Sequence, residues 1–502
     1  MRIVNSEMYF LMLVSFALTF NHVKSAHLIS IPQSDIIPTE MNNSHVRRPL
    51  AEEYNETREN FFRDQLSREL GYDVKLSADE QKVNNFIMKL KRDEIEKGIQ
   101  TPFQFLPSRH IFEVLQQINS SKLFKFIRKL PKGGILHAHD TALCSADYIV
   151  TLLRRDNLWQ CGEFDAKVRP QFKFSQNEPI AVNGCQWKKV SEIRTRLGDS
   201  EYDRLARKLF TLYSDDPRNT FKDINDVWRT FMNIFTTLDP IVTYAPVFKD
   251  YYYQALKELY EDGVTYLEFR GLFPTVYDFE RTYGPVEIAG MYVETLKSFM
   301  DSHPGFLGSK FVYAPIRFTD DATFDGYLKT VEELREKYPN FIAGFDLVGQ
   351  EDLGRPLKDY ASRLLKMPED LNFFFHAGET NWHGTPTDEN LIDAVLLGAK
   401  RIGHGFASIK HPKVLEEIKR KHICLEVNPI SNQVLKLVDD YRNHPAAFFF
   451  SDNYPVIISS DDPSFWETTP LSHDFYMAFL GIASAHQDLR VLKKISGKFN
   501  KL

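Results

Sequence analysis

The chain has 502 residues, of which 43% are hydrophobic and 26% charged, a composition typical of folded globular proteins. This length is enough for one large domain with additions, or for two to three domains. The formal net charge of −6 leaves no extended positive surface, so we do not expect nucleic acid as a partner.

Residues 1–25 have the pattern of a secretory signal peptide. Arg2 precedes an apolar run from Met8 to Phe20, and the small residues Ser25 and Ala26 follow it. The run is shorter than the ~20 residues that cross a bilayer, and no later stretch is long and apolar enough. We therefore expect a secreted, extracellular protein without a membrane span. Three N-glycosylation sequons agree with export, and they begin at Asn42, Asn55 and Asn119.

Residues 26–128 are predicted to form an N-terminal helical extension. Apolar residues at helical spacing mark a first helix that ends at Gly71; they are Tyr54, Phe61, Phe62 and Leu66. A second helix opens with the capping box Ser77-Ala78-Asp79-Glu80 and ends near Gly98. Its apolar stripe consists of Val83, Phe86, Ile87 and Leu90. Such stripes either form a homodimer or pack against the protein's own main domain, and the pattern alone favours neither.

From residue 129 to the C-terminus, short apolar runs alternate with segments of helical period. Eight runs are strand candidates: residues 135–140, 264–270, 310–317, 342–349, 373–379, 401–405, 423–429 and 455–462. Eight successive β/α units predict an α/β fold, a (β/α)8 TIM barrel.

The interval between the first two strand candidates is far longer than the ~30 residues of an ordinary βαβ unit. One helical pattern accounts for part of it, at Ile224, Val227, Trp228, Phe231 and Phe235. The remainder, residues 155–213, is predicted to be an inserted subdomain after strand 1, beside the mouth of the barrel. Cys161 and Cys185 lie in this polar, loop-like region and are predicted to form a disulfide. The other cysteines, Cys144 and Cys424, adjoin strand candidates and are expected to be buried thiols.

Imidazoles and carboxylates recur at the carboxyl ends of four strand candidates, where barrels place their active sites. The four ends read His137-Ala138-His139-Asp140, His376-Ala377-Gly378-Glu379, Gly403-His404-Gly405 and Ser460-Asp461-Asp462-Pro463. Residues i and i+2 of a strand share a face, so His137 and His139 by themselves form half of a metal site. The other strand ends supply the groups that complete it.

These residue types predict one catalytic zinc ion. Zinc accepts imidazole nitrogen and carboxylate oxygen and keeps a position for water, and the predicted ligands are His137, His139, His376 and Asp461. Zinc-bound water becomes a nucleophile near neutral pH. Glu379 can then move a proton to the substrate, and His404 can orient or deprotonate the water. Asp462 can accept a hydrogen bond from bound substrate. The fourth strand candidate lacks the lysine that two-metal barrels of this type use as a bridge, which favours one metal.

The sequence resembles the adenosine deaminase family, and within it the secreted adenosine deaminase-related growth factors. The matching motifs run in the family's order from residue 130 to 465; they are Pro131-Lys132-Gly133-Gly134-Ile135-Leu136-His137-Ala138-His139-Asp140, Asp346-Leu347-Val348-Gly349, His376-Ala377-Gly378-Glu379-Thr380, Gly403-His404-Gly405 and Ser460-Asp461-Asp462-Pro463. The resemblance implies hydrolysis of adenosine to inosine and ammonia, and we expect 2′-deoxyadenosine to be deaminated as well. It also implies a homodimer formed through the N-terminal helices.

The resemblance implies roles for the substrate contacts as well. Glu379 would protonate purine N1, Asp462 would hold N7, and the backbone N–H of Gly349 would face N3. Asp140 would contact the ribose. Trp228 matches a position near the ribose in the secreted branch, although its helical spacing is equally typical of a core residue.

Two alternatives stay open. The first is deamination of another adenine nucleoside or of a nucleotide, although a nucleotide enzyme needs cationic phosphate contacts and none is obvious near the motifs. The second is a secreted signalling protein that binds a cell-surface receptor or a glycan. The presence of every expected ligand favours an enzyme, with growth-factor activity through adenosine depletion.

Overall fold

The computed structural model describes residues 48–164, 169–181 and 184–496, so the predicted signal peptide and the Asn42 sequon lie outside the described residues. The chain divides into two units, residues 61–502 and the residues before them. The described part of the smaller unit is residues 48–60, which include the beginning of helix α1 (Ala51–Ser67).

All eight predicted strands are present in the larger unit, as two parallel four-stranded sheets. The first sheet has the order β1 (Gly133–Ile135), β5 (Val264–Gly271), β8 (Gly308–Tyr313) and β9 (Ile342–Phe345). The second has the order β10 (His376–Ala377), β11 (Arg401–His404), β12 (Cys424–Val427) and β13 (Val456–Ile458). Parallel bridges join Phe345 to Phe373 and Ala138 to Asp461, so the two sheets close on each other. The predicted (β/α)8 TIM barrel is confirmed.

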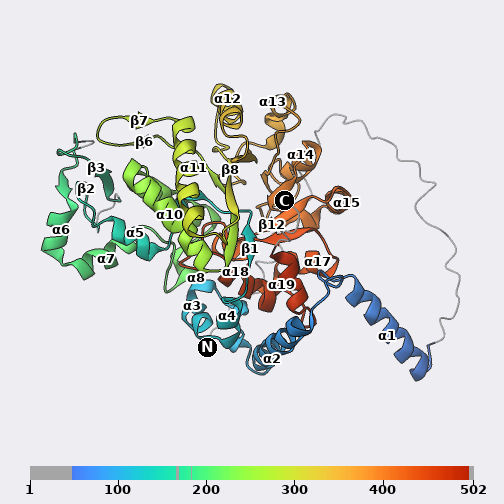
Figure 1. The fold of residues 1–502 in the computed structure, drawn as a ribbon. Helices are drawn as coiled ribbons and strands as arrows, with labels where there is room; N and C mark the ends of the chain where they lie inside the picture. Colours follow the sequence, from blue (N-terminus) through green and yellow to red (C-terminus); the bar gives the residue numbers. More distant parts are fainter. Residues whose placement is uncertain (1–47, 165–168, 182–183, 497–502) are drawn as a thin grey trace, which may run out of the picture. The chain divides into compact units, whose positions relative to one another are not determined.

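Helices surround these strands, as Figure 1 shows. Among them are α10 (Ala245–Glu261), α11 (Pro285–Ser302), α12 (Asp321–Lys337), α13 (Ala361–Leu364), α14 (Asn390–Leu396) and α15 (Pro412–Lys421). Helix α12 illustrates why they form: Asp320 caps its first turn by accepting the N–H of Thr323, and a stripe at positions 324, 328, 331 and 334 is buried. The C-terminal part adds α16 (Pro429–Val434), α17 (Ala446–Ser451), α18 (Ser472–Tyr476), a π-helix (Met477–Ile482) and α19 (Leu489–Ile495).

The segment between β1 and β5 folds into a subdomain and a long helix. Three antiparallel strands, β2 (Leu158–Cys161), β3 (Gln171–Phe174) and β4 (Trp187–Lys189), form a sheet in the order β3-β2-β4. The neighbouring helices are α5 (Ala146–Leu152), α6 (Val190–Leu197), α7 (Asp199–Arg207) and α8 (Pro217–Thr220), and α9 (Ile224–Val242) follows. A two-stranded ribbon of β6 (Val276–Tyr277) and β7 (Thr282–Tyr283) lies after β5.

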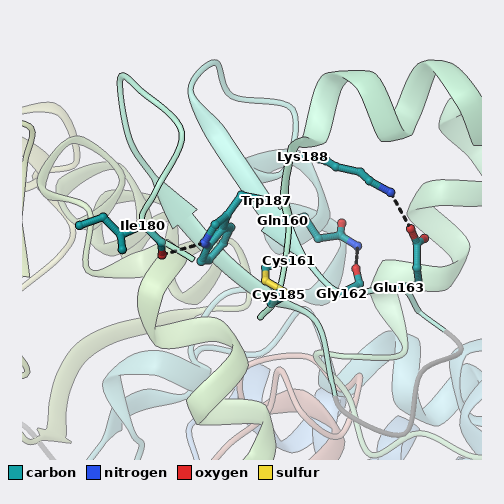
Figure 2. Close-up of a disulfide and its surroundings, with 8 residues drawn as sticks. All are labelled: Gln160, Cys161, Gly162, Glu163, Ile180, Cys185, Trp187 and Lys188. Carbon is teal, nitrogen blue, oxygen red and sulfur yellow. Dashed lines mark hydrogen bonds and ion pairs between the residues drawn. A yellow bond between two sulfur atoms is a disulfide. The ribbon is translucent and has the colours of Figure 1, made fainter. Parts of the chain in front are cut away.

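The predicted disulfide between Cys161 and Cys185 is confirmed (Figure 2). We expected a loop-like region, but Cys161 is the last residue of β2 and pairs across the ladder with Trp187 of β4. The indole N–H of Trp187 donates to the carbonyl of Ile180 at 3.2 Å, and Trp159 and Trp187 are buried against the disulfide. The sheet escaped prediction because its strands have only three or four residues. Of the two free thiols, Cys144 is buried as expected, whereas Cys424 is half-buried.

The predicted N-terminal helices are present as α1 (Ala51–Ser67) and α2 (Ala78–Gln100), followed by α3 (Ile111–Ser120) and α4 (Lys122–Ile127). The Ser77–Glu80 capping box of α2 is formed. Ile87 of α2 is fully buried, and the buried Lys91 ammonium donates to the carbonyls of Ser484 and Gln487 at 2.6 and 2.9 Å. Helix α2 therefore packs against the protein's own C-terminal region.

Helix α1 differs from α2, because none of its residues is buried. Its apolar residues Tyr54, Phe61 and Phe62 are exposed. The sequon asparagines Asn55, on α1, and Asn119, on α3, are exposed too. None of the helices within the described residues combines the length and apolar character needed to cross a bilayer.

Candidate metal centre and substrate pocket

The predicted metal ligands meet at the carboxyl ends of the barrel strands. One ligand atom from each of His137, His376, His404 and Asp461 lies within 4.8 Å of the others. His139 reaches the same carboxylate: its Nε2 lies 3.0 Å from Asp461 Oδ1, and the Nε2 of His137 lies 3.2 Å from that oxygen. His404 is slightly further out, with Nε2 at 3.6 Å from both Asp461 Oδ2 and Glu379 Oε1. The four-membered group thus contains His404 and not the predicted ligand His139, which approaches it through Asp461. His404 also lies within reach of Glu379, the predicted proton carrier.

The donor atoms of this cluster fit a divalent cation. Imidazole nitrogens lie close to Asp461 Oδ1, but these contacts lack the geometry of hydrogen bonds. The buried atoms that make no hydrogen bond to the described residues are His137 Nε2, His404 Nε2, Asp461 Oδ1, Glu379 Oε1 and Asp462 Oδ1. A buried polar group without a partner costs about 1–3 kcal/mol, so such groups seldom gather without a reason. Three imidazoles and a carboxylate are a ligand set that zinc accepts. A metal ion and a polar substrate would satisfy these atoms together.

A second layer of charged residues orients the imidazoles. The Nδ1 of His137 lies 2.8 Å from Glu426 Oε2, and the Nδ1 of His376 lies 2.6 Å from Asp346 Oδ2. Arg270 joins the two carboxylates, donating to Asp346 at 2.8 Å and to Glu426 at 2.5 Å. Because both Nδ1 atoms are engaged, both Nε2 atoms face the cluster, an arrangement common behind metal-binding histidines.

Sequence reasoning missed this second layer. Arg270 and Glu426 lie inside the strand candidates 264–270 and 423–429, and Asp346 begins the motif Asp346-Leu347-Val348-Gly349, but the predicted site includes none of the three. The available signal was the presence of charged residues within otherwise apolar strands, because a charge in a barrel interior is rarely tolerated without a partner. All three side chains are fully buried.

The cluster separates the acidic groups by their proton affinity. Burial alone would raise the pKa of both Asp346 and Glu426. The neighbouring His376 and Arg270 instead lower the pKa of Asp346 well below its ordinary value. Arg270 and Arg401 do the same for Glu426. Glu379 behaves in the opposite way: burial, then the negative charges of Asp461 and Glu351, raise its pKa well above the ordinary value. Glu379 is therefore suited to hold a proton at neutral pH.

Three backbone positions of the site have left-handed conformations. His404 and Asp461 both have φ of 61°, which is uncommon for residues with a side chain and concentrates at functional sites. Gly349 has φ of 102°, a value that favours glycine. Glycine is needed for space at Gly271, where a Cβ would lie 2.1 Å from Asp140 Oδ2.

One cavity adjoins the metal cluster and brings nine of the ten predicted catalytic, metal-ligand and substrate residues to its wall. They are His139, Asp140, Trp228, Gly349, His376, Glu379, His404, Asp461 and Asp462, and His137 is fully buried behind them. Trp382 and His383, which follow Glu379 closely, are exposed, and neither lines this cavity. Trp228, 7% exposed, thus contributes both to the cavity wall and to the core.

Helix α9 forms the apolar wall of the cavity. Its lining residues have the i, i+3, i+4 spacing of one helix face; they are Trp228, Phe231, Met232, Phe235, Thr236 and Asp239. Sequence reasoning identified the helix but missed Asp239. Burial, then the neighbouring charge of Asp140, raises the pKa of Asp239 to about 7. Asp140 accepts the hydroxyl of Tyr292 at 3.2 Å and the N–H of Thr141 at 2.8 Å, and burial raises its pKa to about 6.

Comparison with known proteins agrees with this geometry. The family model described as adenosine deaminase matches residues 211–498, and the model described as adenosine/AMP deaminase N-terminal matches residues 11–127. An adenosine deaminase from Aedes albopictus is 55% identical over 451 residues, which cover 90% of this chain and 84% of that protein. Adenosine deaminase 2 from Homo sapiens is 38% identical over 448 residues, 88% of this chain and 87% of that protein.

Among solved structures, an amidohydrolase from Burkhoderia ambifaria with bound Zn has a TM-score of 0.52 at 16% identity, over 74% of this chain and 85% of that chain. This likeness supports the barrel fold alone. The matched family model covers more than half of the chain, and relatives over 30% identical are matched along most of their length. The chain belongs to the adenosine deaminase family.

Proposed function

We propose that the protein is a secreted, zinc-dependent adenosine deaminase. It hydrolyses adenosine to inosine and ammonia, and 2′-deoxyadenosine to 2′-deoxyinosine and ammonia. The observation that carries the proposal is the convergence of imidazoles, Asp461 and a proton-holding Glu379 at one end of a mostly apolar cavity. The names of the similar proteins support the same reaction.

The ligand set proposed for the zinc ion is His137, His139, His376 and Asp461. Three of them share one cluster with His404, and His139 lies 3.0 Å from the Asp461 carboxylate. Zinc bound there would supply the polarisation that lets a water molecule lose a proton near neutral pH. Side chains and backbone of the protein would do the remaining work. Glu379 delivers its proton to purine N1. Burial, then the charge of Asp461, raises the pKa of Asp462 well above its ordinary value, so that its protonated carboxyl donates to N7, and the N–H of Gly349 donates to N3. His404 orients the attacking water from its position 3.6 Å from Glu379 and Asp461. Trp228 and Asp140 contact the ribose.

A nucleoside is a better substrate for this cavity than a nucleotide. Within the described residues, the cavity wall contains no lysine or arginine, whereas it contains the carboxylates Asp140 and Asp239. A phosphate group needs cationic partners and would meet negative charge here. We therefore propose adenosine and 2′-deoxyadenosine as substrates and not their monophosphates.

The decisive experiment compares the wild type with Glu379→Gln and with Glu369→Gln, a control at an exposed glutamate. Adenosine loss is followed by ultraviolet absorbance, and zinc content by elemental analysis. We expect Glu379→Gln to retain zinc and to lose at least about 100-fold in turnover, the scale of general acid–base catalysis. The control should match the wild type. A zinc-loaded wild type that leaves adenosine intact would overturn the proposal.

We further propose that any growth-promoting effect arises from removal of extracellular adenosine. The same Glu379→Gln variant tests this in a cell-growth assay, where it should be inactive. Growth activity that survives the substitution would instead support the alternative, binding to a receptor or glycan.

Export and glycosylation belong to the same proposal. The apolar run at the N-terminus and the sequons at Asn42, Asn55 and Asn119 support it. Expression in eukaryotic cells should release a protein whose N-terminus lies near Ser25 or Ala26. Glycosidase treatment should reduce its mass, and retention of the uncleaved chain inside the cell would contradict export.

We propose a homodimer that uses the exposed apolar side chains of α1. Tyr54, Phe61 and Phe62 are exposed on a helix with no buried residue, whereas α2 packs on its own chain. Light scattering should report a dimer for the wild type and a monomer for Phe61→Ser combined with Phe62→Ser. A wild-type monomer, or a dimer that persists in the double variant, would exclude this interface.

A further inference from the structure

Outside the catalytic cluster, two histidines and an aspartate converge at the surface of the barrel. His383 and Asp388 belong to the loop between β10 and α14, and His411 directly precedes α15. One ligand atom from each residue lies within 4.8 Å of the others. None of the three lines the substrate cavity.

The geometry of this group resembles that of the catalytic cluster. His411 Nε2 lies 3.0 Å from both carboxylate oxygens of Asp388, the same distance as that between His139 Nε2 and Asp461. The rings of His383 and His411 have centroids 5.2 Å apart. Centroid distances in the catalytic cluster range from 4.5 Å for His137–His376 to 5.6 Å for His137–His139. The separations thus suit donors around one ion.

The charge of Asp388 supplies a second, independent reason for a cation. Its side chain is fully buried and accepts the N–H of Gly384 at 2.6 Å. Its one ion-pair contact in the described part of the chain is with His411, which is cationic only if protonated. The nearby Lys410 donates to the carbonyl of Asn381 at 2.7 Å. A buried carboxylate without a fixed positive partner is costly, and a divalent ion would neutralise it.

We propose that His383, Asp388 and His411 form a second, peripheral site for a borderline divalent cation such as Zn²⁺ or Co²⁺, with water completing the coordination. Imidazole and carboxylate donors select such ions over Ca²⁺ or Mg²⁺. The bound ion ties the loop that follows Glu379 to the beginning of α15. The main effect of the bound ion is therefore to order residues 380–389. This effect does not depend on the reaction catalysed nearby.

The test uses the full protein with its catalytic site loaded with zinc. Titration with Co²⁺, followed by calorimetry and visible absorption, should reveal one further equivalent, while elemental analysis checks that the catalytic zinc stays. His383→Gln should weaken this binding at least about 10-fold, the scale for loss of a metal-site group. His383 is exposed, so this variant should fold. His422→Asn, at an exposed histidine outside the cluster, should bind like the wild type.

Hydrogen exchange adds a readout of the loop itself. Co²⁺ should slow exchange of the amides in residues 380–389 of the wild type and leave them unchanged in His383→Gln. The absence of a further equivalent, or one that His383→Gln binds as tightly as the wild type, would overturn the proposal.

A separate observation concerns the last residue of α9 that faces the substrate cavity. Asp239 is the one ionisable side chain on the cavity-lining face of this helix, and it lies near enough to Asp140 for the two charges to interact. Within the described residues, its carboxylate has no hydrogen bond or ion pair with another side chain. It is therefore available to a ligand.

We infer that Asp239 is a specificity-determining residue, whose carboxylate accepts a hydrogen bond from a ribose hydroxyl and helps Asp140 to repel a 5′-phosphate. This inference rests on the proposed function, because it assumes that an adenine nucleoside enters the cavity. It explains why an otherwise apolar helix face ends in an acidic side chain.

The test compares kcat and KM of the wild type, Asp239→Asn and the control Glu369→Gln with adenosine and with adenosine monophosphate. Asp239→Asn should raise KM for adenosine about 10-fold with little change in kcat, the scale of one hydrogen bond. It should also raise the efficiency with the monophosphate relative to adenosine by at least about 10-fold. An active wild type whose KM and substrate ratio are unaffected by Asp239→Asn overturns this inference alone, whereas an inactive wild type overturns the proposed function.

Discussion

The Asp346 carboxylate lies 2.6 Å from Nδ1 of His376, so a residue that follows β9 orients an imidazole at the start of β10. The other oxygen of Asp346 accepts the backbone N–H of His376 at 2.8 Å. Both the ring and the backbone of this predicted ligand are therefore held by one carboxylate. With Nδ1 engaged, the ring can offer only Nε2 to a metal ion.

We expect Asp346→Asn to weaken zinc binding about 10- to 100-fold, because an amide orients and polarises the imidazole less well than a carboxylate. Affinity can be measured by competition with a chromophoric chelator. Arg270 also loses an ionic partner in this variant, so thermal unfolding of the metal-free protein has to be recorded alongside. Asp359→Asn, at an exposed aspartate that also pairs with an arginine, Arg355, is the control. Unchanged affinity in a folded Asp346→Asn protein would show that this pair is not a metal-site support.

Much of the site could be predicted because of one property of parallel barrels. Their strands present their carboxyl ends at the same rim, so His137, His376, His404 and Asp461 could be grouped from sequence order alone. The partners of Arg270 and Glu426 could not be predicted. They depend on the register between strands that lie far apart in the sequence. The sheet of the insert was missed for a related reason: its short strands are stabilised by tertiary contacts around Trp159 and Trp187.

Acid should destabilise the protein through buried histidines such as His473. Burial, then Arg128, lowers the pKa of His473 to about 3, and its Nδ1 accepts the N–H of Thr469 at 3.0 Å. An unfolded histidine has a pKa of about 6.5. Between these values the unfolded chain binds the extra proton, so the contribution to stability is complete above about pH 6.5 and is lost as the pH falls towards 3.

For His473 alone, this difference in pKa lowers the free energy of unfolding by about 2 kcal/mol between pH 7.5 and pH 5. Urea unfolding at the two pH values should therefore show a smaller pH-dependent loss of stability in His473→Gln than in the wild type. His422→Asn is the control, since His422 is exposed and its left-handed backbone, with φ of 53°, tolerates asparagine. An equal loss of stability in all three proteins would exclude His473 as a cause.

Removal of the disulfide should loosen the insert without damaging the substrate cavity. Cys161 and Cys185 are separated by 24 positions, and closing a loop of that size stabilises by about 3 kcal/mol on the loop-entropy model. The double variant Cys161→Ser, Cys185→Ser should have a lower melting temperature. A protease should also cleave it more readily within residues 155–213. Its kcat/KM for adenosine should stay near the wild-type value, because residues 155–213 contribute nothing to the described cavity wall.

Cys424→Ser, which removes a half-buried free thiol, is the matched control for the loss of sulfur. It should resist protease as the wild type does. If the double variant lost activity while the insert stayed protected, the disulfide would act on the cavity through a route other than the stability of this subdomain.

An experiment can decide whether Trp228 is a substrate contact or a core residue. Its ring meets Phe231 edge-on at 5.2 Å, and both residues line the cavity. Trp466 is a useful contrast: it is fully buried and stacks on the same Phe231 at 5.7 Å, but it does not line the cavity. A substrate-contacting tryptophan should act on KM, whereas a core tryptophan should act on stability.

We expect Trp228→Ala to raise KM for adenosine about 10-fold, and Trp228→Phe to recover most of that loss, since an aromatic wall contact contributes about 1 kcal/mol. Trp466→Phe should lower the melting temperature and leave KM unchanged. The measurement is steady-state kinetics beside thermal unfolding of all three variants. If Trp228→Ala lowered only the melting temperature, Trp228 would be a core residue, and the nucleoside would have to be held by Asp140 and the other cavity residues without it.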